Sequence, residues 1–403
     1  MQLININNFI KEYITHREQS LFAGDLLEYN AELSEKIYNK SVLVIGGAGT
    51  IGSSFVHAIL KFRPAKLYIV DTNENGLTEL TRDLRSTENQ YIPVDYKTYP
   101  MDFATDIFRK MVRNEGPFQI VANFAAHKHV RSEKDKYSIE AMLGNNVFNA
   151  KQLLDFLSEN PPEHFFCVST DKAANPVNVM GASKKLMEET IMAYSTSMKI
   201  TTARFANVAF SNGSLLDGYI YRLMKQQPLA CPGDVKRFFV SPEESGQICL
   251  LACILGNSGE IYFPKLHDDQ MVYFKDITIN FLEQSGKTVI QANTEEEAKA
   301  YFADNEDSHN YPVYFFTSDT SGEKLYEEFY DAQDIVDLEL YQGMGVIKNA
   351  KVVTLAKIET IIEKLKMLMQ QSEYDKSDIV LAMKEILPDF QHIETGKSLD
   401  GKM

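Results

Sequence analysis

Residues 41–60 read SVLVIGGAGTIGSSFVHAIL, and this stretch decides the fold. Ser41–Ile45 is a short β-branched run that stops at glycines, which is typical of a buried parallel strand. The following residues, GGAGTIGSSFVHAIL, open a helix. Between the two elements the glycines have the spacings Gly47-x-Gly49-x-x-Gly52 and Gly46-x-x-Gly49-x-x-Gly52.

Glycines between a strand and a helix suit a dinucleotide site, because they allow a tight turn and a close approach of the backbone to a pyrophosphate. The start of the helix adds free N–H groups that attract phosphates. The next strand, KLYIVD, ends in Asp71, about 20 residues after the last glycine, where a carboxylate binds the adenosine ribose. No arginine follows Asp71 directly, so NAD is favoured over NADP. The alternative is a glycine turn in a nucleotide-free α/β protein. The expected cofactor-binding residues are Gly46, Gly47, Gly49, Thr50, Ile51, Gly52, Asp71, Asp102, Ala125, Ala126 and Lys184.

Strand-like and helical segments alternate as far as residue 206, which predicts a doubly wound, Rossmann-type parallel sheet. In such sheets ligands bind outside the carboxyl ends of the strands. The glycine turn, Asp71, Ala125-Ala126 and Ser169–Lys172 all follow predicted strands. We therefore expect them to meet at one edge of the sheet.

Four regions are expected along the chain. Residues 1–40 are predicted to be a helical extension, and 41–206 the NAD-binding Rossmann domain. Residues 207–330 are rich in loops and suit a smaller, mainly substrate-binding lobe. Residues 331–403 are predicted to add C-terminal helices, with an amphipathic segment at 353–369.

Composition narrows the class of protein. The 403 residues carry a formal charge of −15, which argues against broad nucleic-acid binding. No run reaches the roughly 20 apolar residues that span a bilayer, and MQLININNFIKEY does not resemble a signal peptide. We expect a cytoplasmic protein without membrane contact. No metal site is expected, since the cysteines are read as buried thiols: Cys167, Cys231, Cys249 and Cys253.

The stretch FFCVSTDKAANPVNVMGASK, residues 165–184, holds the candidate chemistry. Asp171 and Lys172 follow a predicted strand side by side, and one of them can donate a proton while the other accepts one. The alternative for these two residues is a surface ion pair at a strand end. Eight residues after Lys172 comes Met180, and four further on Lys184.

These motifs resemble the extended short-chain dehydrogenases/reductases. More narrowly they resemble nucleotide-sugar 4,6-dehydratases that act on UDP-N-acetylglucosamine. The resemblance rests on the glycine turn, NFAAHKHV and STDKAANPVNVMGASKK, with RFANVAFSNGSLL and VKRFFVSPEESGQ as sugar- and nucleotide-binding segments, and it covers about residues 41–264. SDTSGEK, residues 318–324, and the tail HIETGKSLDGKM resemble the soluble branch that serves legionaminic acid biosynthesis.

The chain departs from the family at one position. Short-chain dehydrogenases usually carry Tyr-x-x-x-Lys, whereas this sequence has Met180-x-x-x-Lys184. A thioether has no proton to exchange near neutral pH, so Met180 cannot serve as the base. The resemblance points to a subgroup that retains the C5 configuration and has methionine there. It leaves the base of the oxidation step unassigned.

The resemblance implies a role for each candidate residue. Asp171 is the acid for the C6 oxygen and Lys172 the C5 base. Thr170 hydrogen-bonds the C4 oxygen, and Lys184 holds the nicotinamide ribose, with water or Thr170 relaying the C4 proton. Met180 contacts the nicotinamide or sugar, or simply fills the core. The expected substrate-binding residues are Lys128, His129, Asn207 and Arg237.

Several alternatives stay open at this stage. The substrate is a UDP- or a GDP-N-acetylglucosamine. Rival functions are a nucleotide-sugar 4-epimerase and a catalytically silent regulator that binds NAD or a sugar nucleotide. A homo-oligomer is expected, because the long helices predicted at about 137–159 and 178–197 commonly pair between subunits in this fold.

Overall fold

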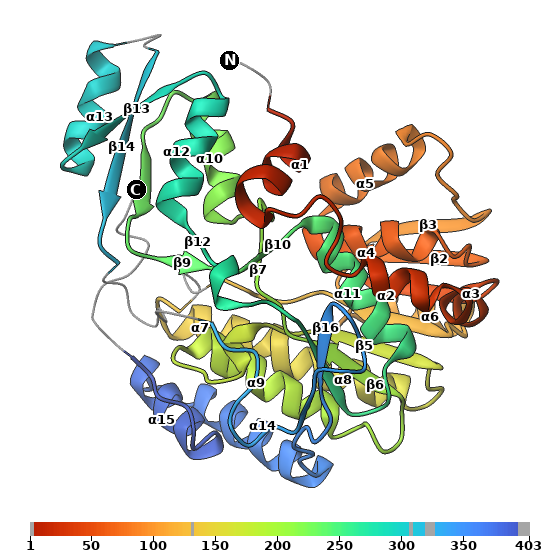
Figure 1. Ribbon diagram of the computed structural model, residues 1–403. Helices are drawn as coiled ribbons and strands as arrows, with labels where there is room; N and C mark the ends of the chain where they lie inside the picture. The colour runs from red at the N-terminus through yellow and green to blue at the C-terminus, as the bar shows by residue number, and fades with distance from the viewer. Residues whose placement is uncertain (1–3, 130–132, 306–308, 319–326, 394–403) are drawn as a thin grey trace.

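The computed structural model describes residues 4–129, 133–305, 309–318 and 327–393. A nine-stranded sheet forms its centre, in the order β15-β16-β11-β6-β5-β4-β1-β2-β3 (Figure 1). Seven of these strands are parallel, and β16 and β15 add an antiparallel edge. Their bounds are β1 Ser41–Ile45, β2 Lys66–Asp71, β3 Asp95–Pro100, β4 Ile120–Asn123, β5 His164–Val168, β6 Ile200–Ala203, β11 Glu260–Pro264, β15 Val336–Asp337 and β16 Met344–Ile347. The predicted Rossmann-type sheet is confirmed.

Both faces of the sheet are buried, as the apolar run in β1 predicts. Leu43 and Ile45 pack into the core on one side, and Val42 and Val44 pack into the core on the other. The helices that contribute core residues on the first side are α6 Asp106–Glu115, α7 Lys136–Leu143, α8 Asn149–Leu157 and α9 Val179–Met192. Those on the second side are α3 Asn30–Ile37, α4 Thr50–Leu60, α5 Glu74–Ser86 and α11 Pro242–Leu255.

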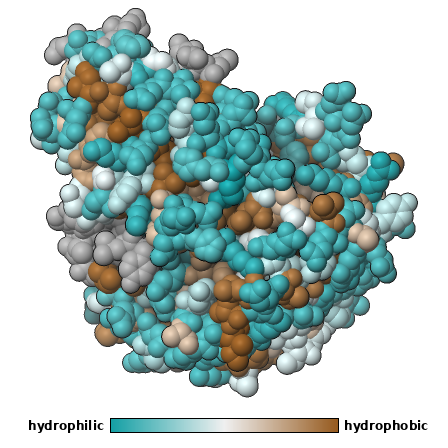
Figure 2. All heavy atoms as spheres, viewed as in Figure 1, coloured by the Kyte–Doolittle hydropathy of each residue, from teal (hydrophilic) through white to brown (hydrophobic). Residues whose placement is uncertain are grey.

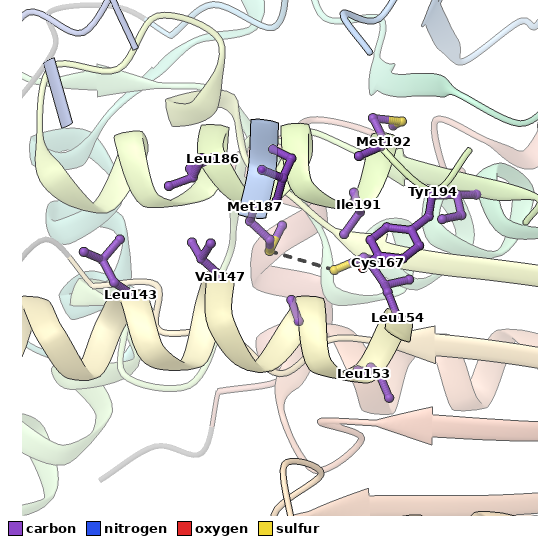
Figure 3. Packing of buried hydrophobic residues seen from close by; sticks show 14 of the residues in the cluster. Leu143, Val147, Leu153, Leu154, Cys167, Leu186, Met187, Ile191, Met192 and Tyr194 are labelled. Atoms are coloured by element: carbon purple, nitrogen blue, oxygen red, sulfur yellow. Dashed lines mark hydrogen bonds between the residues drawn. The ribbon is translucent and has the colours of Figure 1, made fainter. Parts of the chain in front are cut away.

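Helix α9 is almost wholly buried, although it carries residues from the predicted site. Figure 3 shows its residues Met187 and Ile191 packing toward α8, with Met187 against Cys167 of β5. The Sγ of Cys167 lies 3.9 Å from the Sδ of Met187. All four cysteines are free and buried, which confirms their reading as core thiols.

Two C-terminal helices, α14 Leu355–Met369 and α15 Lys376–Ile386, cover this side of the molecule. Ile358, Ile362 and Leu365 of α14 belong to the same core cluster as α9. The helix face expected at 178–197 for pairing between subunits is therefore occupied by the chain's own C-terminus. The homo-oligomer itself stays a prediction.

A smaller lobe projects from the sheet domain (Figure 1). It contains a three-stranded parallel sheet in the order β13-β14-β8 and its own core. The elements of the lobe are β8 Leu229–Pro232, β13 Thr288–Ala292, β14 Asn310–Phe316, α10 Leu215–Met224, α12 Phe274–Gln284 and α13 Glu295–Asp304.

The face of the molecule in Figure 2 is mostly hydrophilic, with hydrophobic residues in scattered patches.

The boundaries differ from the sequence expectation in three places. Within 207–330, α11 and β11 return to the main sheet domain, because both are apolar enough to be buried there. Residues 331–403 contribute β15 and β16 as well as helices. The long helix expected at 137–159 is divided by a π-helical turn, Gly144–Phe148.

The N-terminal extension is tied to the rest of the chain by buried polar contacts. Arg17 donates two hydrogen bonds to the Glu244 carboxylate, at 2.9 and 2.8 Å. The buried Asp25 accepts hydrogen bonds from the amides of Gln342 and Gly343, at 2.6 and 2.8 Å. Helix α1 Ile6–Phe9 and the π-turn Ile10–Thr15 pack on the lobe. Among the residues described, no helix has the length and apolarity that a membrane crossing requires.

Candidate functional site

The glycine turn between β1 and α4 is closely packed where the sequence predicts it. Gly46 has φ of +75°, and a Cβ there would lie 2.5 Å from the backbone nitrogen of Ala125. A Cβ on Gly52 would lie 2.3 Å from the Gly46 carbonyl oxygen. Only glycine fits these two positions, because one needs a left-handed backbone and the other a close helix–strand approach.

The first turn of α4 is arranged to receive a phosphate. Gly49 is its N-cap, and no side chain caps the helix. The nearest atom to a Cβ on Gly49 would be the Gly46 oxygen at 3.6 Å, which is an ordinary van der Waals contact. Free N–H groups and the helix dipole at such an end favour an anion. These residues fit the pyrophosphate of a dinucleotide.

Asp71 completes this half of the site at the end of β2. Its Oδ2 accepts a hydrogen bond from the amide of Ala48 in the glycine turn, at 2.9 Å, and its Oδ1 accepts one from Asn73 at 2.9 Å. The carboxylate is thus fixed directly beside the turn. That position fits a ribose-binding acid of the NAD type.

Thr170, Asp171 and Lys172 form one cluster at the carboxyl end of β5. The Oγ1 of Thr170 donates to Asp171 Oδ1 at 2.6 Å, and the Nζ of Lys172 lies 3.2 Å from both carboxylate oxygens. The side chain of Asp171 is buried, whereas that of Lys172 is 31% exposed. Burial acts to lower the pKa of Lys172, but its carboxylate neighbours outweigh burial and raise it. In this state Lys172 is an ammonium.

A second carboxylate, Glu327, joins this cluster. Its Oε1 accepts a hydrogen bond from the Nδ2 of Asn207 at 2.6 Å. The same oxygen lies 3.7 Å from Lys172 Nζ and 3.5 Å from Arg237 Nε. Asn207 and Arg237, both predicted as substrate-binding residues, are therefore brought next to the Asp171–Lys172 pair. Sequence patterns gave no signal for Glu327, because it lies in a loop without a motif.

Helix α9 backs the cluster through its first turn. A Cβ on Gly181 would lie 2.6 Å from the carbonyl oxygen of Lys172, so the helix sits tightly against the 171–173 turn. Met180 is 2% exposed. The Nζ of Lys184 is buried, donates to the Val168 carbonyl at 3.0 Å, and has its pKa lowered by burial.

The other predicted residues lie further out. Lys128 and His129 are exposed, and a Cβ on Gly213 would lie 3.1 Å from the His129 ring. The exposed Asp102 accepts a hydrogen bond from the Ala104 amide at 2.8 Å and so supports the turn after β3. Ala125 and Ala126 follow β4 beside the glycine turn.

The structure adds two groups of buried polar residues that sequence reasoning missed. The amide of Asn146 bonds the backbone of His127 through both its oxygen and its nitrogen, at 2.8 and 3.0 Å, and also reaches Ser183 Oγ at 3.1 Å. Glu188 pairs with Arg204 at 2.9 and 2.7 Å. In the sequence, the signal that could have revealed them is a charged or amide residue inside a segment that is predicted to be a buried helix or strand.

A family model described as polysaccharide biosynthesis protein matches residues 42–349. An uncharacterized membrane protein of Methanocaldococcus jannaschii is 31% identical over 85% of this chain and 99% of that protein. The capsular polysaccharide biosynthesis protein CapD of Staphylococcus aureus is 27% identical over 84% of this chain, which spans 52% of CapD. A UDP-N-acetylglucosamine 4,6-dehydratase (inverting) of Campylobacter jejuni is 26% identical over 56% of this chain and 67% of that enzyme.

Solved structures share the fold. Pen from Bacillus thuringiensis aligns with a TM-score of 0.62 at 19% identity, over 88% of this chain and 98% of Pen. DesIV, a dTDP-glucose 4,6-dehydratase from Streptomyces venezuelae solved with NAD, aligns with a TM-score of 0.53 at 19% identity, over 72% of this chain and 88% of DesIV. The chain belongs to the polysaccharide biosynthesis protein family and has the extended short-chain dehydrogenase/reductase fold of NAD-dependent nucleotide-sugar dehydratases and epimerases.

Proposed function

We propose that this protein is an NAD-dependent nucleotide-sugar 4,6-dehydratase that acts on UDP-N-acetylglucosamine and yields the 4-keto-6-deoxy sugar nucleotide. The observation that carries the proposal is the acid–amine pair Asp171–Lys172 at the end of β5, on the same sheet edge as the glycine turn. A 4-epimerase needs hydride transfer alone, whereas a dehydratase also needs an acid and a base for elimination. The likeness to the Campylobacter 4,6-dehydratase, an inverting enzyme, supports the type of reaction but not the C5 configuration of the product.

Different residues of the chain carry out the separate proton transfers of the reaction. When bound, NAD supplies hydride transfer from C4 to C6 with no net redox change. Asp171 gives a proton to the departing C6 oxygen, and Lys172 removes the C5 proton. Lys184 fixes the nicotinamide ribose from α9.

The hydrogen bond from Thr170 to Asp171 supports a relay in place of the missing tyrosine. Thr170 Oγ1 takes the C4 hydroxyl proton while it passes its own proton to the Asp171 carboxylate. Asp171 is thereby protonated, and it later gives this proton to the C6 oxygen. Met180 lines this region without titrating.

The proposal extends to the setting of the enzyme: bacterial surface-glycan or nonulosonic acid biosynthesis in the cytoplasm, with retained C5 configuration. The segments that resemble the legionaminic acid branch fall mostly on residues 319–326 and 394–403, outside the described residues. GDP-N-acetylglucosamine and a silent sugar-nucleotide regulator are the alternatives that the experiment separates.

The test offers purified protein an equimolar mixture of UDP- and GDP-N-acetylglucosamine and follows both by mass spectrometry. We expect the UDP sugar to lose the mass of one water. Loss of water from the GDP sugar alone would reassign the nucleotide. Binding of both without turnover would favour the regulator and refute the dehydratase.

A further inference from the structure

Glu327 is a buried carboxylate to which the proposed mechanism gives no task. Its side chain is 3% exposed, next to a Lys172 side chain that is 31% exposed. Asn207, Lys172 and Arg237 all approach the Oε1 atom. The other oxygen, Oε2, is buried without a hydrogen-bond partner among the described residues. Oε1 is therefore the oxygen that faces Lys172 and is placed to receive a proton from it.

The proposed function, on which this inference rests, leaves Lys172 in the wrong form. A C5 base must be a neutral amine, yet Lys172 faces the carboxylates of Asp171 and Glu327, which hold it as an ammonium. Asp171 cannot accept a proton from the Lys172 ammonium, because it already receives the C4 proton through Thr170. A second acceptor is required.

We propose that Glu327 is the proton acceptor of Lys172: it takes a proton from the Lys172 ammonium and so produces the neutral amine that removes the C5 proton. Glu327 acts through Lys172 and is a positioning residue of the reaction. Their 3.7 Å separation is about 0.8–1.0 Å longer than a charged hydrogen bond. A small change in the flexible lysine side chain closes that gap.

Burial narrows the pKa gap between the donor and the acceptor of this transfer. Burial raises the pKa of Glu327 to about 7, with the charge of Asp171 adding to it and Lys172 and Arg237 opposing it. Burial also acts against the charged form of Lys172. Once Asp171 is protonated, Lys172 loses one of its two anionic neighbours, which lowers its pKa. Glu327 loses the same neighbouring charge, so burial is then the cause that keeps the pKa of Glu327 raised. Proton transfer to Glu327 then replaces a buried ion pair by two neutral groups, which a water-poor site favours.

The proton balance closes over one turnover. The C4 hydroxyl proton passes through Thr170 to Asp171 and leaves with the C6 oxygen as water. The Lys172 amine takes the C5 proton and returns it to C5 as hydride arrives at C6. Glu327 then gives its stored proton back to Lys172. Every group ends in its starting form.

The experiment compares Glu327→Gln, which keeps the shape but cannot accept a proton, with the wild type. The matched control is Glu328→Gln, since that neighbouring carboxylate bonds Asn175 instead, at 2.9 Å. We expect Glu327→Gln to lower kcat about 100-fold, the usual scale of a lost proton-transfer group, with KM and NAD affinity retained. The kcat of wild type should rise with pH through about 7 as Glu327 ionises, and this acid limb should vanish in the variant.

A second readout needs no turnover. The pKa of Glu327 lies above its unfolded value, so the folded protein binds more protons than the unfolded chain between the two values. Wild-type stability should therefore fall, relative to Glu327→Gln, as pH rises from about 5 to about 8. Unfolding midpoints of the ligand-free proteins across this range measure the difference, and Glu328→Gln should follow wild type.

An unchanged kcat and acid limb in Glu327→Gln would overturn the inference. If that variant does not fold, Glu327→Asp is measured instead. This variant keeps a carboxylate acceptor, so its kcat should still rise with pH. A Glu327→Asp enzyme without this acid limb would also overturn the inference. A wild-type protein that dehydrates no sugar nucleotide would instead refute the proposed function. In that case the pH dependence of unfolding still reports on Glu327.

Discussion

The buried ion pair Glu188–Arg204 stabilises the core next to the site. The substitution Arg204→Met tests this role. Arg204 is 2% exposed and its guanidinium donates to both oxygens of a 3% exposed carboxylate, at 2.9 and 2.7 Å. It also donates to the Phe329 carbonyl at 2.8 Å, two residues after Glu327. The substitution leaves the Glu188 carboxylate buried without its cation. We expect the free energy of unfolding to fall by about 3–5 kcal/mol.

Urea unfolding at pH 7 measures this loss, and Lys36→Met is the control. Lys36 pairs with Glu32 at 2.6 Å on the surface, with side chains 33% and 44% exposed, so its loss should cost about 0–1 kcal/mol. The double variant Arg204→Met/Glu188→Leu should be more stable than Arg204→Met, because no charge is then left uncompensated. An Arg204→Met protein within about 1 kcal/mol of wild type would refute the reasoning.

Three further outcomes follow from the site. Lys172→Ala should abolish exchange of the C5 proton with solvent deuterium while NAD binding persists; NMR of the recovered sugar would show retained exchange if another group is the base. Met180→Tyr should bring no gain in kcat, since the Thr170 relay replaces the tyrosine and overpacking a buried position costs about 1–3 kcal/mol; a faster enzyme would argue against the relay. Gly46→Ala should weaken NAD binding in calorimetry and destabilise the protein by at least about 1–2 kcal/mol, because its φ is +75°. The control Gly218→Ala, where a Cβ meets nothing within 4 Å, should bind NAD normally.

Local motifs were sufficient to predict where the glycine turn and Asp71 lie in the fold. The glycine spacing and Asp71 follow β-strands, and a parallel sheet brings strand ends to one edge whatever the rest of the chain does. The same logic placed Asp171 and Lys172 correctly at the end of β5.

Contacts between distant segments were beyond sequence reasoning. Glu327 lies in an irregular loop far along the chain from Lys172, so no local pattern shows that the two side chains meet. Residues 260–264 were assigned to the loop-rich lobe, yet they form a strand of the main sheet between β16 and β6. The sequence of α9 likewise does not show that α14, far along the chain, packs into the same core cluster.

The most direct test of the central claim follows one deuterium atom. UDP-N-acetylglucosamine labelled with deuterium at C4 is converted by the purified protein, and the product is examined by NMR. A 4,6-dehydratase returns the hydride to C6, so we predict a C6 methyl group carrying the deuterium of the same molecule. Deuterium that remains at C4 in a product with an intact C6 hydroxyl would identify an epimerase and contradict the account.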